Sequence, residues 1–222
     1  MRRLILPLSF GILGFVILMS LGVWQIQRLH WKEGILADIA ARIAAPPVPL
    51  PAHPQVPGDR YLPVTVTGGF TGKEIEVLAS TRDDGAGVRV IAAFLTDTGR
   101  KVMVDRGFLP EDLRGQPRTV TEITITGNLH WPDEKDGFTP PPDARTGLWF
   151  ARDVPAMAEK LATEPVLIVA RNDTGDQIRP MPVDTSGIPN DHLGYALQWF
   201  GMAAVWAGMT GLYLWRIRRR TV

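Results

Sequence analysis

The stretch LILPLSFGILGFVILMSLGVW, residues 4–24, contains no charged side chain, and neither does LGYALQWFGMAAVWAGMTGLYLW, residues 193–215. A helix needs about 20 consecutive apolar residues to cross the hydrocarbon core of a bilayer. Both stretches are long enough, so the sequence predicts a transmembrane helix near each end of the chain. A cleavable signal peptide is the alternative for the first stretch, and a buried core helix is the alternative for the second.

Charge is distributed unevenly around the two stretches. All 23 acidic residues lie between them, whereas the short tails, residues 1–3 and 216–222, carry six of the 24 basic residues. Because short basic tails stay on the cytoplasmic side, both termini are expected there, or in the mitochondrial matrix of a eukaryote. The middle is then expected in the periplasm of a bacterial inner membrane. Its net charge of −5 argues against a nucleic-acid partner.

The residues between the two stretches divide into three parts. Residues 25–60 are expected to extend the first helix to about Ala45 and then to form a linker, which begins at Pro46-Pro47. Residues 61–183 are predicted to form a β-rich domain, and residues 184–192 a connector to the second stretch.

Short runs that alternate apolar and polar residues predict the strands of this domain. The predicted strands are Tyr61–Phe70, Glu74–Ala79, Val88–Leu95, Lys101–Phe108, Thr119–Leu129, Leu148–Arg152, Val166–Ala170 and Ile178–Val183. A helix over Asp153–Leu161, capped by Asp153, is inserted among them, and the polar stretch Trp131–Arg145 is predicted to be a long loop. The expected fold class is membrane α+β, in which two transmembrane helices flank an antiparallel β-rich domain.

Signatures of enzymes are absent from the sequence. There is no cysteine, which excludes disulfides, thiolate nucleophiles and cysteine-bound metals, and there is no HExxH, GxSxG or glycine-rich phosphate loop. The paired acids Asp83-Asp84 and Glu111-Asp112 fall in predicted turns. The four histidines are isolated from one another, so their spacing predicts no soluble zinc site.

Small residues recur in both apolar stretches, with Gly11 and Gly14 in the first and Ala203, Ala207 and Gly208 in the second. Small residues allow helices in a membrane to approach closely. The two stretches are therefore expected to pack on each other, and the helix of a partner protein is the alternative occupant.

His192 differs from the other histidines because it lies where the second apolar stretch begins. Asn190 is predicted to cap this helix. Tyr195 and Trp199 follow His192 on the same helical face, and a flat apolar ligand such as haem could rest there, with the imidazole as its axial ligand. The plainer interpretation is a histidine that binds water, lipid or the neighbouring helix.

The first apolar stretch ends in a similar arrangement. Trp24, Arg28 and Trp31 share one face of the predicted helix. Arg28 is predicted to bind an acidic group, either a haem propionate or a carboxylate of a partner, while a contact with lipid phosphate is the alternative.

Four motifs give the chain a family resemblance. They are LGxWQxxRLxWK at residues 21–32, VDRGFLP at 104–110, WxxxDxxxMA at 149–158 and PNDHLxYAxxWF at 189–200. In their residues, their order and their spread over nearly the whole chain, these motifs resemble those of the surfeit locus protein 1 family of cytochrome c oxidase assembly factors. Within the second motif, Gly107 suits a bulge or turn and Arg106 a buried ion pair.

The resemblance implies a non-enzymatic role in building the haem a centres of an aa3-type oxidase. It implies haem a as a transient cofactor, with His192 as candidate iron ligand. The helical faces described above then place Tyr195, Trp199, Arg28 and Trp24 as the residues expected around the haem. The implied partners are the catalytic subunit of the oxidase and membrane lipid, with haem a synthase as a further candidate. A scaffold that never binds haem and a membrane-anchored hydrolase are the competing hypotheses.

Overall fold

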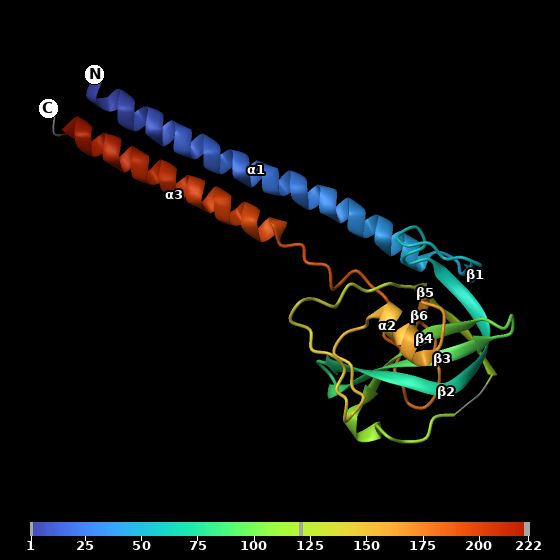
Figure 1. Cartoon of the computed structure of the whole chain (residues 1–222). Helices are drawn as coiled ribbons and strands as arrows, with labels where there is room; N and C mark the ends of the chain where they lie inside the picture. The colour runs from blue at the N-terminus through green and yellow to red at the C-terminus, as the bar shows by residue number, and fades with distance from the viewer. Residues whose placement is uncertain (1, 120–121, 220–222) are drawn as a thin grey trace. The chain divides into compact units, whose positions relative to one another are not determined.

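The computed structural model describes residues 2–119 and 122–219, apart from the side chains of Arg2 and Arg3. The outermost tail residues, 1 and 220–222, and residues 120–121 of the strand predicted at Thr119–Leu129 lie outside this described part. The chain forms two compact units (Figure 1). One unit contains both ends of the chain: the residues up to Asp38 and the residues from Thr185 onward. The other unit is Ile39–Asp184.

The first unit is built from two long helices, α1 (Arg2–Ala44), which belongs to it as far as Asp38, and α3 (His192–Arg219). Among the described residues, α1 is the one helix long and apolar enough to cross a membrane, with a mean hydropathy of 2.4. The prediction of two spans is therefore supported only for the first. α3 falls short because aromatic residues, glycines and Gln198 dilute its aliphatic content.

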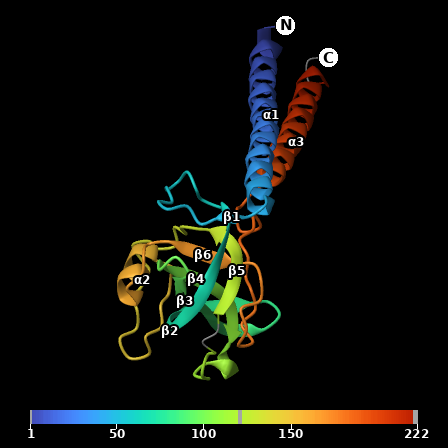
Figure 2. The same cartoon turned by 90° about the vertical axis from the view of Figure 1, so that its right-hand side faces the viewer.

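The two helices of this unit pack side by side in opposite directions (Figures 1 and 2). Glycines of α1 make room for larger side chains of α3. A Cβ atom at Gly14 would lie 2.4 Å from the Trp206 ring, and one at Gly22 would lie 2.3 Å from Phe200. The indole of Trp206 also donates a hydrogen bond to the carbonyl of Gly11, at 2.9 Å. The expected packing of the two stretches is confirmed.

The second unit contains a six-stranded sheet that closes on itself. Its strands are β1 (Val48–Pro49), β2 (Pro63–Thr81), β3 (Gly85–Thr96), β4 (Lys101–Pro110), β5 (Glu122–Leu129) and β6 (Leu167–Ala170). The order is β1-β2-β3-β4-β6-β5, and an additional pairing of β2 with β5 closes the ring. A 3-10 turn, η1 (Glu111–Leu113), follows β4.

The sheet is mixed, so the prediction of an antiparallel sheet was wrong. β1 runs parallel to β2, and β6 runs parallel to β4. β6 enters between β4 and β5 after a long connection that contains α2 (Val154–Leu161). Long connections of this kind permit parallel pairing, which a short hairpin does not.

Apolar side chains fill both faces of the central strands. Val102 and Val104 of β4 belong to a cluster with Phe94 and Ile168, whereas Met103, between them, packs with Met157 of α2. Because both faces are covered, β4 and β6 are buried almost throughout. Asp153 caps α2 as predicted, since its carboxylate accepts a hydrogen bond from the Ala156 amide at 3.2 Å.

Two predicted strands are not formed. Leu148–Arg152 contributes only an isolated bridge between Trp149 and Val77, and Ile178–Val183 only a bridge between Arg179 and Phe108. The second segment contains Pro180 and Pro182, which lack the N–H group that a ladder needs. By contrast, the predicted strands Tyr61–Phe70 and Glu74–Ala79 are joined in the single strand β2, which is irregular between them.

Candidate functional site

His192 is the first residue of α3 and its side chain is half-buried. Its Nδ1 atom lies 2.8 Å from Oε1 of Gln25 on α1. Gln25 is 9% exposed and is the one buried polar side chain among the described residues of the helical unit. Sequence reasoning did not identify Gln25, although it is three residues after Gly22, on the face of α1 that packs against α3.

Asn190 does not cap this helix, contrary to the prediction. α3 begins at His192, and the carbonyl of Asp191 accepts the hydrogen bond of the Tyr195 amide at 3.2 Å. The Oδ1 atom of Asn190 is buried and has no hydrogen-bond partner within the described residues. An unpaired acceptor therefore lies two residues before the imidazole.

Arg28 and Trp24 lie on an exposed side of α1. The Arg28 guanidinium stacks over the ring of Trp31, with its central carbon 3.8 Å from the ring centre. The Trp24 side chain is 52% exposed. Within the described residues, no hydrogen bond joins Arg28 or Trp24 to His192, and Gln25 occupies the position beside the imidazole instead.

Tyr195 is 51% exposed and Trp199 is half-buried, on the turns of α3 that follow His192. An apolar groove of the helical unit lies further along the two helices. It has a volume of about 710 Å³, and its walls include Gly14 and Leu18 of α1 and Gln198 and Met202 of α3. His192, Tyr195 and Trp199 do not line it.

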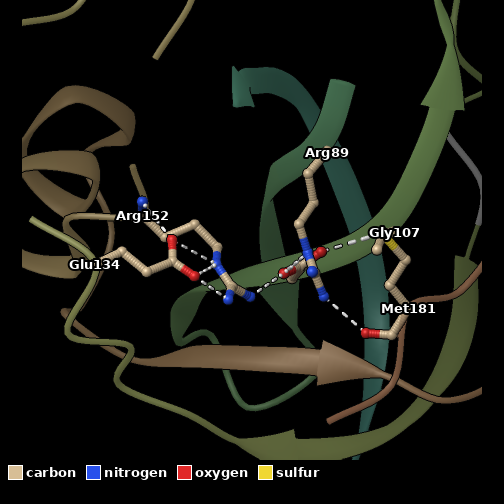
Figure 3. Close-up of polar contacts among 6 residues, drawn as sticks. Arg89, Gly107, Glu134, Arg152 and Met181 are labelled. Carbon is tan, nitrogen blue, oxygen red and sulfur yellow. Dashed lines mark hydrogen bonds and ion pairs between the residues drawn. The ribbon is translucent and has the colours of Figure 1, made fainter. Parts of the chain in front are cut away.

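A separate buried charge cluster lies in the sheet unit (Figure 3). The carboxylate of Asp105, which is fully buried, accepts hydrogen bonds from Arg89 at 2.6 Å and from Arg152 at 3.0 Å. Arg152 also binds Glu134, and Arg89 reaches the carbonyl of Met181 at 2.7 Å. Burial raises the pKa of Glu134, but its hydrogen bonds to Arg152 and the charge of Arg152 outweigh burial and hold that pKa below its usual value.

The Arg106-Gly107 pair forms a β-bulge, because Val90 of β3 pairs with Gly107 while the next residue, Ile91, pairs with Asp105. Gly107 has a φ of +114°, and a Cβ there would lie 1.9 Å from the carbonyl oxygen of Arg179. The extra residue, Arg106, forms a buried ion pair with Asp176 at 2.7 Å. The structural interpretation of this motif is confirmed.

His130, in the sheet unit, is a histidine whose surroundings shift its pKa. Its ring stacks on Tyr61 with a centroid separation of 5.5 Å. Burial, followed by the charges of Arg152 and Arg60, lowers its pKa to about 4. His130 is therefore neutral at physiological pH. Across residues 2–119 and 122–219, no three His, Asp or Glu side chains are grouped to hold a metal ion.

These features define a class of protein: a closed mixed sheet joined to a pair of antiparallel helices, one of them suited to a membrane, with an imidazole where the second helix begins. The chain belongs to the SURF1 family, whose family model matches residues 12–204. Members of this family are known generally as assembly factors of cytochrome c oxidase rather than as catalytic enzymes.

Several relatives show the same similarity over most of the chain. Surfeit locus protein 1 of Rattus norvegicus is 31% identical, over 91% of this chain and 72% of the relative. The protein of the same name in Homo sapiens is 30% identical, over 88% of this chain and 72% of its own length. A SURF1-like protein of Monosiga brevicollis is 30% identical, over 87% and 82%.

Proposed function

We propose that this protein helps to insert haem a into the catalytic subunit of an aa3-type cytochrome c oxidase, and that it binds haem a transiently through His192. The observation that carries the proposal is the half-buried imidazole of His192, held by Gln25 in a chain of the SURF1 family. In this proposal the protein is not an enzyme. The catalytic subunit is its partner, and haem a synthase is a second candidate partner.

The residues around His192 fit a haem iron in their chemistry. A neutral imidazole with one ring nitrogen engaged by the protein is a common iron ligand. Within the described residues, the single hydrogen bond of His192 is made through Nδ1, so Nε2 is available to a ligand. Tyr195 and Trp199 offer aromatic surface on the following turns. The haem would supply the redox centre that the oxidase requires.

The proposed topology places this site at the outer surface of a bacterial inner membrane. Both α1 and α3 would span the bilayer, with the sheet unit in the periplasm. The charge-free stretch of α3 and its basic end at Arg216, Arg218 and Arg219 support this arrangement. Trp24 ends the charge-free stretch of α1 and Arg28 lies one turn beyond it, where Arg28 would attract the propionates of the haem.

The proposal is tested by binding of haem to the purified full-length chain in detergent. We expect His192→Ala to abolish the Soret band of the bound haem, and Arg28→Ala to weaken binding less, because Arg28 would attract the propionates rather than bind the iron. His30→Ala is the matched control, since the His30 side chain is 72% exposed on α1. Unchanged binding by a well-folded His192→Ala protein would refute the haem site.

A scaffold that stabilises an assembly intermediate without haem is the second candidate. One observation favours it. The residues that line the 710 Å³ groove of the helical unit do not include His192, Tyr195 or Trp199, so this groove is separate from the proposed haem site. A scaffold would retain its association with the catalytic subunit after His192→Ala. If the protein instead transfers haem, the same substitution should abolish its effect on oxidase assembly.

A further inference from the structure

Gln25 occupies an unusual position for an amide side chain. It lies on the apolar face of α1 that packs against α3, and only 9% of it is exposed. Burying an amide without a hydrogen-bond partner costs on the order of 1–3 kcal/mol in proteins. The carboxamide oxygen is satisfied by His192, whose Nδ1 lies 2.8 Å from Oε1.

The helices are close enough for this contact because of a glycine one turn earlier on α1. A Cβ atom at Gly22 would lie 2.3 Å from the ring of Phe200. A larger residue would push the helices apart and withdraw Gln25 from the imidazole. The contact is therefore built into the packing of α1 on α3.

The chemistry of the contact fixes the tautomer of His192. The carbonyl oxygen of an amide only accepts hydrogen bonds, so the Nδ1 atom facing it must carry the proton. In a neutral imidazole the other nitrogen, Nε2, then holds the free lone pair. We infer that Gln25 is a positioning residue, which holds His192 in the Nδ1–H tautomer and presents Nε2 as the ligating atom.

This inference rests on the proposed function for its purpose, because the haem iron is the ligand that Nε2 would meet. A hydrogen bond to the far nitrogen of a ligating histidine orients the ring and raises its basicity, and its removal typically lowers metal affinity about 10- to 100-fold. Gln25 would thus control both the affinity for haem and the electronic state of its iron, without touching the haem.

The tautomer is tested without haem, by nitrogen NMR of the full-length chain labelled at its four histidines. His192→Ala identifies the signal. We expect the Nδ1–H form in the wild type and a predominant Nε2–H form in Gln25→Leu. Gln27→Leu is the matched control, because Gln27 is exposed two residues further along α1, and it should leave the signal unchanged. A wild-type His192 in the Nε2–H form would overturn the inference.

The effect on the ligand is tested with iron protoporphyrin IX as the probe. We expect Gln25→Leu to weaken binding about 10- to 100-fold, and Gln25→Glu, which keeps an acceptor, to restore binding with a lower reduction potential of the iron. Helical circular dichroism confirms that each variant is folded. If His192→Ala abolishes binding while Gln25→Leu changes neither affinity nor potential, the positioning role is wrong and the haem site stands. If His192→Ala also has no effect, the proposed function itself fails.

Discussion

Asp105 is the residue on which the charge balance of the sheet unit depends. Its carboxylate is fully buried and shares its single negative charge between two arginines, Arg89 and Arg152, while Glu134 supplies a second negative charge to Arg152. The Gly107 amide donates a third hydrogen bond to the Asp105 carboxylate, at 3.1 Å. Asp105 therefore ties β3 and the segment before α2 to the bulge of β4.

Replacing Asp105 by asparagine should destabilise the protein strongly. The two guanidinium groups would lose their shared counter-charge, and breaking a buried ion pair by removing one partner costs about 3–5 kcal/mol. Urea unfolding of the full-length chain in detergent measures the change. The exposed Asp112 provides the control, and Asp112→Asn should stay within about 0.5 kcal/mol of the wild type. Equal stability of the two variants would contradict the role given to Asp105.

His130 gives the sheet unit a pH-dependent stability. Its pKa is lowered to about 4 in the folded protein, against 6.5 for an ordinary histidine. The unfolded chain therefore binds a proton more readily between these values, and stability should fall as the pH falls from about 6.5 to about 4. Glu134, whose pKa is also lowered, loses its contribution only below its ordinary value of 4.5.

Between pH 4.5 and 6.5 the folded protein keeps Glu134 ionised, while Glu74, whose pKa is raised by burial, adds a slope of opposite sign that the wild type and a His130 variant share. Unfolding free energies measured across this pH range should fall less steeply for His130→Gln than for the wild type. Identical slopes in the two proteins would show that His130 is not buried in its neutral form.

Among the elements, the pairing of α1 with α3 positions the candidate site. A Cβ atom at Gly11 would lie 3.2 Å from the Cβ of Thr210, close to the spacing of a disulfide. Because the chain has no cysteine, a Gly11→Cys and Thr210→Cys pair should cross-link upon oxidation without background, and gel mobility before and after reduction detects the bond.

The control for this cross-link uses a glycine that faces away from α1. Gly208 has no neighbouring atom within 4 Å, so a pair of Gly11→Cys and Gly208→Cys should remain reduced. Cross-linking of the control pair with equal yield would contradict the helix register.

At the scale of the elements, some features could be predicted from local sequence patterns and others could not. The charge-free stretch of α1, the alternating residues of β2 and β5, and the Asp153 cap of α2 are local signals, and each was predictable. The direction of β6 was not, because it depends on a long connection and on burial of both its faces. Gln25 was missed because a single glutamine changes no periodic pattern, although it shares a helical face with Gly22.

For the whole molecule, the uneven distribution of charge along the chain leads to a testable prediction of its membrane topology. If both helices span the membrane, a phosphatase that is active only in the periplasm should work when inserted in the loop at Asp136. The same enzyme should be inactive when fused after Val222. Activity of the second fusion would refute a cytoplasmic C-terminus and, with it, a spanning α3.

The central claim is that the protein acts in the insertion of haem a rather than in its synthesis. The most direct measurement compares cells with and without the gene, by extracting haem a from their membranes and by determining the haem a content of the purified catalytic subunit. We expect haem a to persist in the membranes of the deletion strain, while the catalytic subunit carries less of it and oxidase activity falls in proportion. Disappearance of haem a from the cell, or a catalytic subunit with its full haem a content, would contradict the account.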